Sequence, residues 1–135
     1  DGYKKALAHY NIPLEESLIL KMPSMEVEAT AFDTFFKTQE VDAVLCVNEI
    51  FAMHAMRLAH GMNKRIPEDI SFIGFTDGLL SKFAMPSLTA IAQHGELMGE
   101  EAAKMLIEKV ETESDEATFT TTVLQPTLIE RASTL

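Results

Sequence analysis

Asp42-Ala-Val-Leu-Cys-Val-Asn-Glu49 joins a continuous apolar run to two polar residues that follow it directly. An apolar run such as 43–47 is typical of a strand covered on both faces in a parallel sheet. Asn48 stands where a helix N-cap is expected, because its amide oxygen can accept from the free N–H groups of a first turn. Glu49 lies in that turn, where a negative charge favours the positive end of the helix dipole. The stretch therefore predicts a strand that leads directly into a helix over 49–62.

The same alternation of extended and helical patterns continues on both sides of this stretch. Short apolar or β-branched runs alternate with segments whose apolar residues recur at helical spacing. We expect strands over 18–22, 43–47, 70–75, 88–92, 118–124 and 128–131, and helices over 3–10, 26–37, 49–62 and 96–110. The first helix should bury one face, and Gly61 is a natural C-terminal cap for the third. Strands separated by helices of this length indicate βαβ units, and therefore an α/β fold with a mostly parallel sheet.

The composition is that of one globular domain. The chain has 135 residues, 47% of them hydrophobic and 24% charged, which suits a single packed core. Eleven basic against 21 acidic residues give a net charge of −10, which argues against direct binding to DNA phosphates or to an anionic membrane. No apolar run approaches the roughly 18 residues of a membrane span. The single cysteine, Cys46, excludes an internal disulfide and is compatible with a reducing compartment.

Sequence patterns of common enzyme and metal sites are absent. There is no nucleophile elbow, no glycine-rich phosphate loop and no zinc-binding H-E-x-x-H pattern. His54 and His60 are six residues apart on the expected helix, too far around it to share a metal. Cys46 should be a small buried hydrophobe with a raised thiol pKa. We expect no catalytic residue, no metal and no cofactor, and we interpret methionines at helical spacing, such as Met56 and Met98, as core residues rather than an adaptable binding surface.

Two pairs of polar residues follow expected strands, at the edge where parallel sheets bind ligands. Asn48 and Glu49 follow the strand over 43–47, and Thr76 and Asp77 follow the strand over 70–75. An amide offers donors and an acceptor, and a carboxylate accepts hydroxyl protons, so these residues suit the hydroxyl groups of a sugar. Each pair also has a purely structural interpretation, because Asn48 can serve as a helix cap and Asp77 can open a turn.

Several motifs, taken in order, resemble one known family. They are Asp42-Ala-Val-Leu-Cys-Val-Asn-Glu49, Ala55-Met-Arg57, Gly61 followed by Ile66-Pro-Glu-Asp-Ile-Ser-Phe-Ile-Gly-Phe75, Pro86-Ser-Leu-Thr-Ala-Ile-Ala-Gln93, Met98-Gly-Glu-Glu-Ala102 and Leu128-Ile-Glu-Arg-Ala-Ser-Thr134. Together they resemble the effector-binding region of the lactose-repressor family of bacterial transcriptional regulators. The resemblance covers nearly the whole chain, and the stretch over 66–75 is its most specific part.

This resemblance implies a two-lobed sensor with a periplasmic-binding-protein-like fold. Residues 1–91 would form most of the C-terminal lobe, 92–125 a crossover helix and strand of the N-terminal lobe, and 126–135 a return to the C-terminal lobe. A small effector, expected to be a sugar or sugar derivative, would bind between the lobes of a cytoplasmic homodimer or higher oligomer. Operator DNA would be bound only through an N-terminal helix-turn-helix that these residues lack, and no membrane would be involved.

The sequence departs from the family pattern at the expected site. The family has Asn-Asp where this chain has Asn48 and Glu49, and Asn48 matches the effector-contacting Asn. The family's sugar-binding Asp falls at Thr76, which carries no charge, with Asp77 next to it. Either Asp77 takes over this contact or the ligand differs from an ordinary hexose.

The resemblance also implies that a central strand of the C-terminal lobe is missing beside the strands over 18–22 and 43–47. We expect such a fragment to re-pair its strands, to swap elements between chains or to oligomerise, with contacts through 49–62 and 79–85. The alternative to a regulator is a periplasmic-type sugar-binding module of a transport system. An α/β enzyme whose catalytic half lies outside these residues is a third hypothesis, which no residue here supports.

Overall fold

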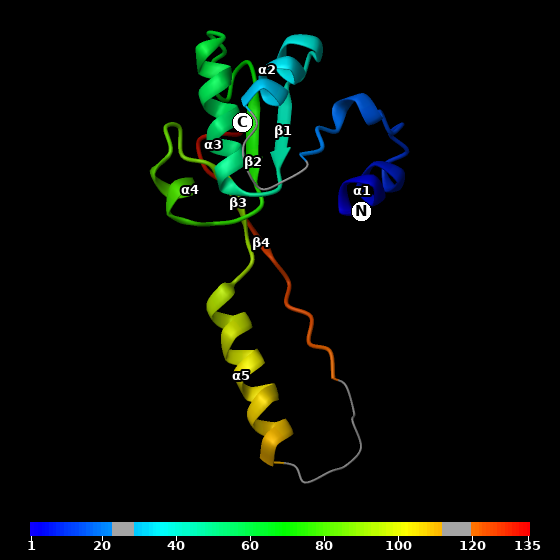
Figure 1. Cartoon of the computed structure of the whole chain (residues 1–135), viewed down its shortest axis with the longest axis vertical. Helices are drawn as coiled ribbons and strands as arrows, with labels where there is room; N and C mark the ends of the chain where they lie inside the picture. The colour runs from blue at the N-terminus through cyan, green and yellow to red at the C-terminus, as the bar shows by residue number, and fades with distance from the viewer. Residues whose placement is uncertain (23–28, 112–119) are drawn as a thin grey trace.

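The computed structural model describes residues 1–22, 29–111 and 120–135. Figure 1 shows a globular part built around a small sheet, from which one long helix projects. The elements in chain order are α1 (Gly2–His9), a 3₁₀ turn (Glu16–Leu18), α2 (Ala29–Thr38), β1 (Ala43–Cys46), α3 (Glu49–Gly61), β2 (Ser71–Gly74), α4 (Leu79–Phe83), β3 (Thr89–Ala92), α5 (Gly95–Glu111) and β4 (Thr127–Ile129).

The sheet has four strands in the order β1-β2-β3-β4. The pairs β1–β2 and β2–β3 are parallel, and β3–β4 is antiparallel. This arrangement confirms the predicted α/β class with a mostly parallel sheet. It also confirms that the stretch over 42–49 is a strand leading into a helix.

Helix α3 covers only one face of the sheet. Val44 pairs in register with Phe72, and Cys46 with Gly74, so their side chains share one face. Phe72 is fully buried on that face, and a side chain at Gly74 would contact Ala52 of α3. Leu45 points to the opposite face and is 54% exposed. The expectation that this strand is covered on both faces is therefore wrong, because no described element packs against the second face of β1.

The expected strand over 18–22 does not form. Ile19 has extended backbone angles, with φ −110° and ψ 102°, but the segment joins no ladder. Over the described residues β1 pairs only with β2 and stands at the sheet edge. Extended backbone becomes a strand only where a neighbouring strand can pair with it, and 18–22 has none. The sheet has not re-paired to close this edge.

Helix α1 forms where predicted, but it does not bury the expected apolar face. None of its residues is buried, and Leu7 is only half-buried. Figure 1 shows α1 lying apart from the layer formed by α2 and α3. The periodic pattern therefore predicts the helix correctly, while the partner for its apolar side is not among the described residues.

The N-terminus of α3 follows the prediction and its C-terminus does not. The backbone N–H of Phe51 donates to Asn48 Oδ1 at 2.8 Å, which confirms the N-cap. Gly61 is still helical, and the chain leaves the helix through Met62 and Asn63, where Asn63 takes the left-handed φ of 58°. Asn can replace Gly at such a position because its short polar side chain tolerates that conformation.

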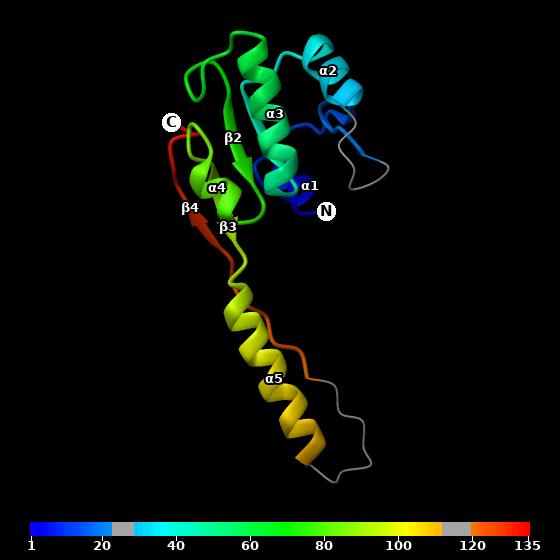
Figure 2. The ribbon, with the colours of Figure 1, turned by 60° about the vertical axis from the view of Figure 1, so that its left-hand side comes forward.

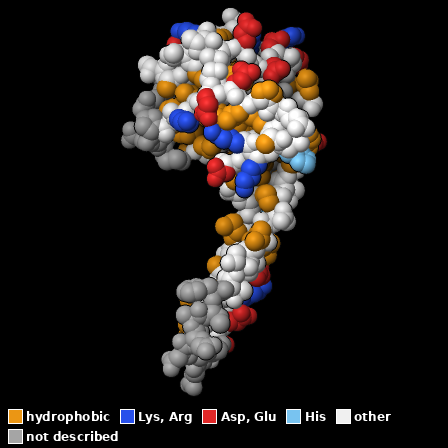
Figure 3. Space-filling model, turned by 90° about the vertical axis from the view of Figure 1, so that its right-hand side faces the viewer, with side chains coloured by type: hydrophobic (Ala, Val, Ile, Leu, Met, Phe, Trp, Pro, Cys, Tyr) orange, Lys and Arg blue, Asp and Glu red, His pale blue; other side chains and the backbone are white. Residues whose placement is uncertain are grey.

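Helix α5 projects from the globular part, and the chain after residue 120 runs back beside it (Figure 2). None of its residues is buried, and Met98 is exposed, so the prediction of a core role for Met98 is wrong. Met56 of α3 is buried as predicted. Of the expected strand over 118–124, residues 118 and 119 lie outside the described residues and 120–124 are not in a strand. Figure 3 shows hydrophobic side chains at the surface of both the globular part and the upper part of this projection.

His54 gives the core a pH-sensitive contact. Its ring packs edge-on against Phe32 of α2, with ring centroids 5.2 Å apart, and its buried Nε2 has no hydrogen-bond partner among the described residues. Burial, with a smaller contribution from the charge of Arg57, lowers the pKa of His54. Protonation would place an unsatisfied charged N–H in this contact.

We therefore expect the free energy of unfolding to fall when the pH is lowered from about 7.5 to about 5.5. The lowered pKa means that the unfolded chain binds this proton more readily, so the stabilisation is complete above the ordinary imidazole pKa of about 6.5 and is lost below it. Urea unfolding of His54→Phe, which keeps the aromatic contact, should show a smaller loss over the same range. Parallel pH curves for the two proteins would contradict this role.

Over the described residues, no helix has both the length and the apolar character required to cross a lipid bilayer.

Candidate functional site

A pocket of about 470 Å³ opens at the carboxyl ends of β2 and β3, where the chain passes into α5. Parallel sheets bind ligands at such an edge, because loops there diverge from neighbouring strands. Three segments meet at it: the turn after β2, the end of β3 and the first turn of α5. The lining residues are Thr76, Asp77, Ala92, Gln93, His94, Gly95, Glu96, Leu97 and Met98.

Thr76 and Asp77, two of the four residues predicted for a ligand site, therefore lie together in this pocket. The Thr76 hydroxyl donates to the carbonyl of Phe75, and the Thr76 carbonyl accepts from Ser81 Oγ at 3.0 Å. These bonds fix the turn that carries both side chains. The Thr76 oxygen retains acceptor capacity for a ligand hydroxyl.

Asp77 is held by Arg131, a residue from the far end of the chain. Arg131 Nη2 donates to Asp77 Oδ1 at 2.5 Å, and Nη1 donates to the carbonyl of Leu88 at 2.7 Å. The two charged side chains are 13% and 15% exposed, so the pair is largely removed from water. Arg131 thereby fixes the Asp77 carboxylate and leaves Oδ2 as its remaining hydrogen-bond acceptor.

Asn48 and Glu49 do not line this pocket. Asn48 uses its amide oxygen as the cap of α3. Glu49 Oε2 accepts from the backbone N–H and the hydroxyl of Ser81, at 3.1 and 3.2 Å. Its carboxylate also packs against Gly78, where any side chain would collide with it. Glu49 therefore stabilises the turn before α4. Of the four predicted site residues, only Thr76 and Asp77 line the pocket.

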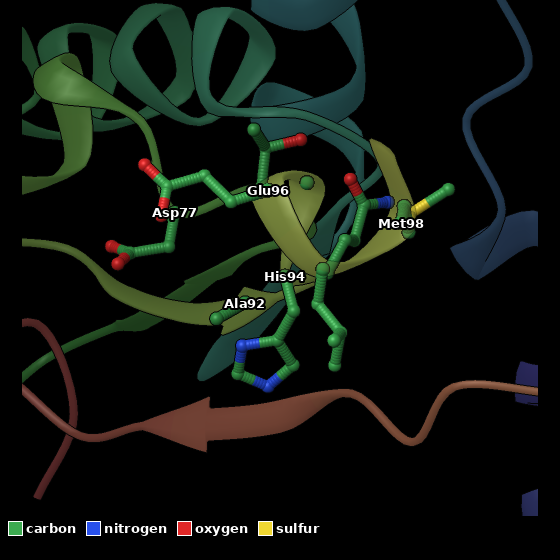
Figure 4. Close-up of a pocket in the computed structure, with 9 residues that line it drawn as sticks. Asp77, Ala92, His94, Glu96 and Met98 are labelled. Atoms are coloured by element: carbon green, nitrogen blue, oxygen red, sulfur yellow. The ribbon is translucent and has the colours of Figure 1, made fainter. Parts of the chain in front are cut away.

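The part of the pocket that follows β3 was not predicted from the sequence. His94 has a left-handed φ of 55°, and its Nε2 lies 2.8 Å from Thr127 Oγ1 at the start of β4. Figure 4 shows the side chains of Asp77 and Glu96 on the same side of the pocket, while the His94 ring is directed towards β4. The rule about carboxyl ends of strands applies equally to Gln93 and His94, and it would have found them.

Cys46 of β1 is a free, buried cysteine. Burial raises the pKa of the Cys46 thiol to about 12, as predicted for a small buried side chain in this strand. Among residues 1–22, 29–111 and 120–135, no three His, Cys, Asp or Glu side chains are grouped so that they could hold a metal ion. The pocket itself offers a hydroxyl, an amide, an imidazole and two carboxylates, which suits hydrogen bonding to a polar ligand.

Comparison with known proteins identifies the family. The sequence matches the family described as periplasmic binding protein-like domain over residues 1–134. It is 33% identical over 135 residues to the HTH-type transcriptional repressor PurR of Erwinia tasmaniensis, covering 98% of this chain and 39% of that protein. The chain belongs to the lactose-repressor family of periplasmic binding protein-like domains.

Solved structures of this family share the fold. The complex of the transcriptional regulator CelR with cellobiose superimposes with a TM-score of 0.84 at 28% identity, covering 98% of this chain and 40% of that one. A LacI family transcriptional regulator from Enterococcus faecium with bound ribose gives a TM-score of 0.82 at 27% identity, covering 98% and 49%. The chain thus spans less than half the length of these relatives.

The lactose-repressor family membership confirms the resemblance read from the sequence. These relatives are transcriptional regulators, not enzymes, in agreement with the expectation for this chain. Their names also favour a regulator over a module of a transport system.

Proposed function

We propose that this chain is the effector-binding and dimerisation region of a bacterial DNA-binding transcriptional regulator, and that its effector is a sugar or sugar derivative. The observation that carries the proposal is the pocket after β2 and β3, in which Thr76 and the immobilised Asp77 face a polar ligand site. The cellobiose and ribose bound to related regulators support a sugar as the ligand class. DNA binding would belong to a further part of the regulator.

In this proposal residues 1–91 and 126–135 belong to one lobe, and residues 92–125 cross to a second lobe. Helix α5 supports the assignment, because it projects from the sheet with exposed apolar side chains at Leu106, Ile107 and Val110. The pocket lies where the chain leaves β3 for α5, so a bound ligand would contact both lobes. It would act by favouring the lobe arrangement for which it has the higher affinity.

Substitution of Asn48 tests whether the ligand site extends beyond the pocket to the N-terminus of α3. Its amide oxygen caps α3, which leaves the two Nδ2 hydrogens as donors for a ligand hydroxyl. We expect Asn48→Ala in the intact regulator to weaken binding of a sugar effector by about tenfold, as for one lost hydrogen bond. The measurement is calorimetric titration, with cellobiose and ribose as the probes.

Asn48→Ser is the matched control, because serine still caps a helix. If Asn48 contacts the ligand, both variants lose affinity and only Asn48→Ala loses about 1 kcal/mol of stability. Equal affinity of Asn48→Ala and the wild type would remove this residue from the site. Failure of both sugars to bind the wild type would count against the proposed ligand class.

The surface of α4 and the loop after it suits a second copy of this chain. Leu79, Leu80, Phe83 and Met85, which we call the α4 patch, are all exposed, with Phe83 at 80% and Met85 at 88%. His60 Nε2 lies 3.3 Å from the carbonyl of Met85, so the patch is fastened to the C-terminal end of α3. An exposed apolar group of this kind marks a protein contact.

We expect Phe83→Asp to shift the protein to the monomer by at least about tenfold in the dimer dissociation constant, since it places a charge in the apolar contact. Light scattering at several concentrations measures the shift. Val123→Asp is the control, because Val123 is a comparably exposed apolar residue far from α4. An unchanged mass for Phe83→Asp would assign the contact to another surface.

A further inference from the structure

The two carboxylates that line the pocket differ in whether a basic side chain compensates their charge. Asp77 is neutralised by Arg131, and the pair is largely buried. Glu96 has no ion pair among the described residues, and it lies on the same side of the pocket as Asp77 (Figure 4). No Lys or Arg is among the residues that line this pocket. The wall formed by this chain therefore carries one uncompensated negative charge.

The start of α5 would otherwise attract an anion. A helix N-terminus carries partial positive charge and free N–H groups, which favour phosphates and carboxylates. Glu96 occupies the first turn of α5, where its carboxylate opposes that positive end. The N–H of Met98 is also engaged, since it donates to the carbonyl of His94 at 3.0 Å. The helix end is thus already supplied with a negative charge of its own.

The guanidinium of Arg131 is not available to bind an anionic ligand either. Arg131 already donates to Asp77 through Nη2 and to the carbonyl of Leu88 through Nη1. Turning Arg131 towards a phosphate would leave Asp77 buried and unpaired, which is strongly unfavourable.

We propose that this wall selects an effector without negative charge, a neutral or aminated polyol, and that Glu96 is the specificity-determining residue. The inference rests on the proposed function and narrows it. Hydroxyl and ammonium groups donate hydrogen bonds to the Glu96 carboxylate and to the second oxygen of Asp77, whereas a phosphorylated or carboxylated sugar is repelled.

The test is a titration with inorganic phosphate, followed through the backbone amide resonances of residues 93–98 in this chain. Sodium chloride at equal ionic strength corrects for screening. The variant is Glu96→Gln, which removes the charge and keeps the shape of an exposed side chain. Glu100→Gln is the matched control, because Glu100 lies one turn further along α5 and outside the pocket.

We expect no saturable phosphate response at these amides in the wild type or in Glu100→Gln. Glu96→Gln should bind phosphate at these amides at least roughly tenfold more tightly than the wild type. Phosphate binding by the wild type at the same amides would overturn the proposal. So would the absence of binding by Glu96→Gln, or an equal gain in both variants. The titration contains no sugar, so its outcome is separate from whether a sugar binds at all.

Discussion

Replacing Arg131 with methionine is expected to lower the free energy of unfolding by about 3 kcal/mol. The change removes a guanidinium that is 15% exposed and leaves the Asp77 carboxylate, 13% exposed, without a counter-charge. It also removes the donor to the carbonyl of Leu88, the residue directly before β3. The loss exceeds the value of an ordinary ion pair, because the remaining charge is left in a poorly solvated position. Urea unfolding followed by circular dichroism measures it.

Arg65→Met is the matched control for this prediction. Arg65 Nη2 donates to Asp69 Oδ1 at 2.7 Å, but Arg65 is 70% exposed and both partners remain in contact with water when separated. Exposed pairs of this kind stabilise a protein by about 1 kcal/mol or less. A loss of equal size in the two variants would mean that the Asp77–Arg131 pair is solvated in solution. The double variant Asp77→Asn, Arg131→Met should recover part of the loss, because it removes the stranded charge.

The sequence predicted those features of the fold that depend on local pattern. The strand over 43–46 and the helix after it follow from an apolar run, a capping Asn48 and helical spacing, all within a few residues of each other. The parallel sheet follows from the alternation of such units. Neither result required knowledge of distant contacts.

Features that depend on distant partners were not predicted correctly. Ile19 is extended, and 120–124 is rich in Thr and Val, yet neither 18–22 nor 120–124 forms a strand, because no neighbouring strand pairs with them. Similarly, α1 and α5 have the apolar spacing of covered helices and are not buried by any described element. Periodicity indicates which side of an element is apolar, but it does not supply the surface that covers it.

In the candidate site, too, the residues placed by local sequence pattern were predicted and those placed by distant contacts were not. Thr76 and Asp77 were predicted as ligand-binding residues because they follow a strand, and the structure places both in the lining of the pocket. Arg131 was not identified as the partner of Asp77, because 54 residues separate them. Glu49 could not be assigned from its position alone, since its hydrogen bonds to Ser81 arise only from the packing of α4 against α3.

The second large effect is expected at Ser133, where alanine should lower the free energy of unfolding by about 3 kcal/mol. Ser133 is fully buried, and its hydroxyl makes two hydrogen bonds to neighbouring strands. Oγ donates to the carbonyl of Phe72 at 2.6 Å and accepts from the N–H of Thr89 at 2.8 Å. Alanine leaves one buried carbonyl and one buried N–H without these partners, and each unsatisfied group costs about 1–3 kcal/mol.

Ser87→Ala is the control for Ser133→Ala, because it also removes a serine hydroxyl close to β3 and the segment after β4. Ser87 Oγ accepts only a long, exposed bond of 3.5 Å from the N–H of Ala132, so its loss should cost less than about 0.5 kcal/mol. Ser133→Ala should also speed hydrogen exchange at the Thr89 amide, because that N–H loses its acceptor. If Ser133→Ala unfolds at the same urea concentration as Ser87→Ala, the segment after β4 does not fasten β2 to β3. In that case the position of Arg131, two residues earlier, would depend on its own hydrogen bonds alone.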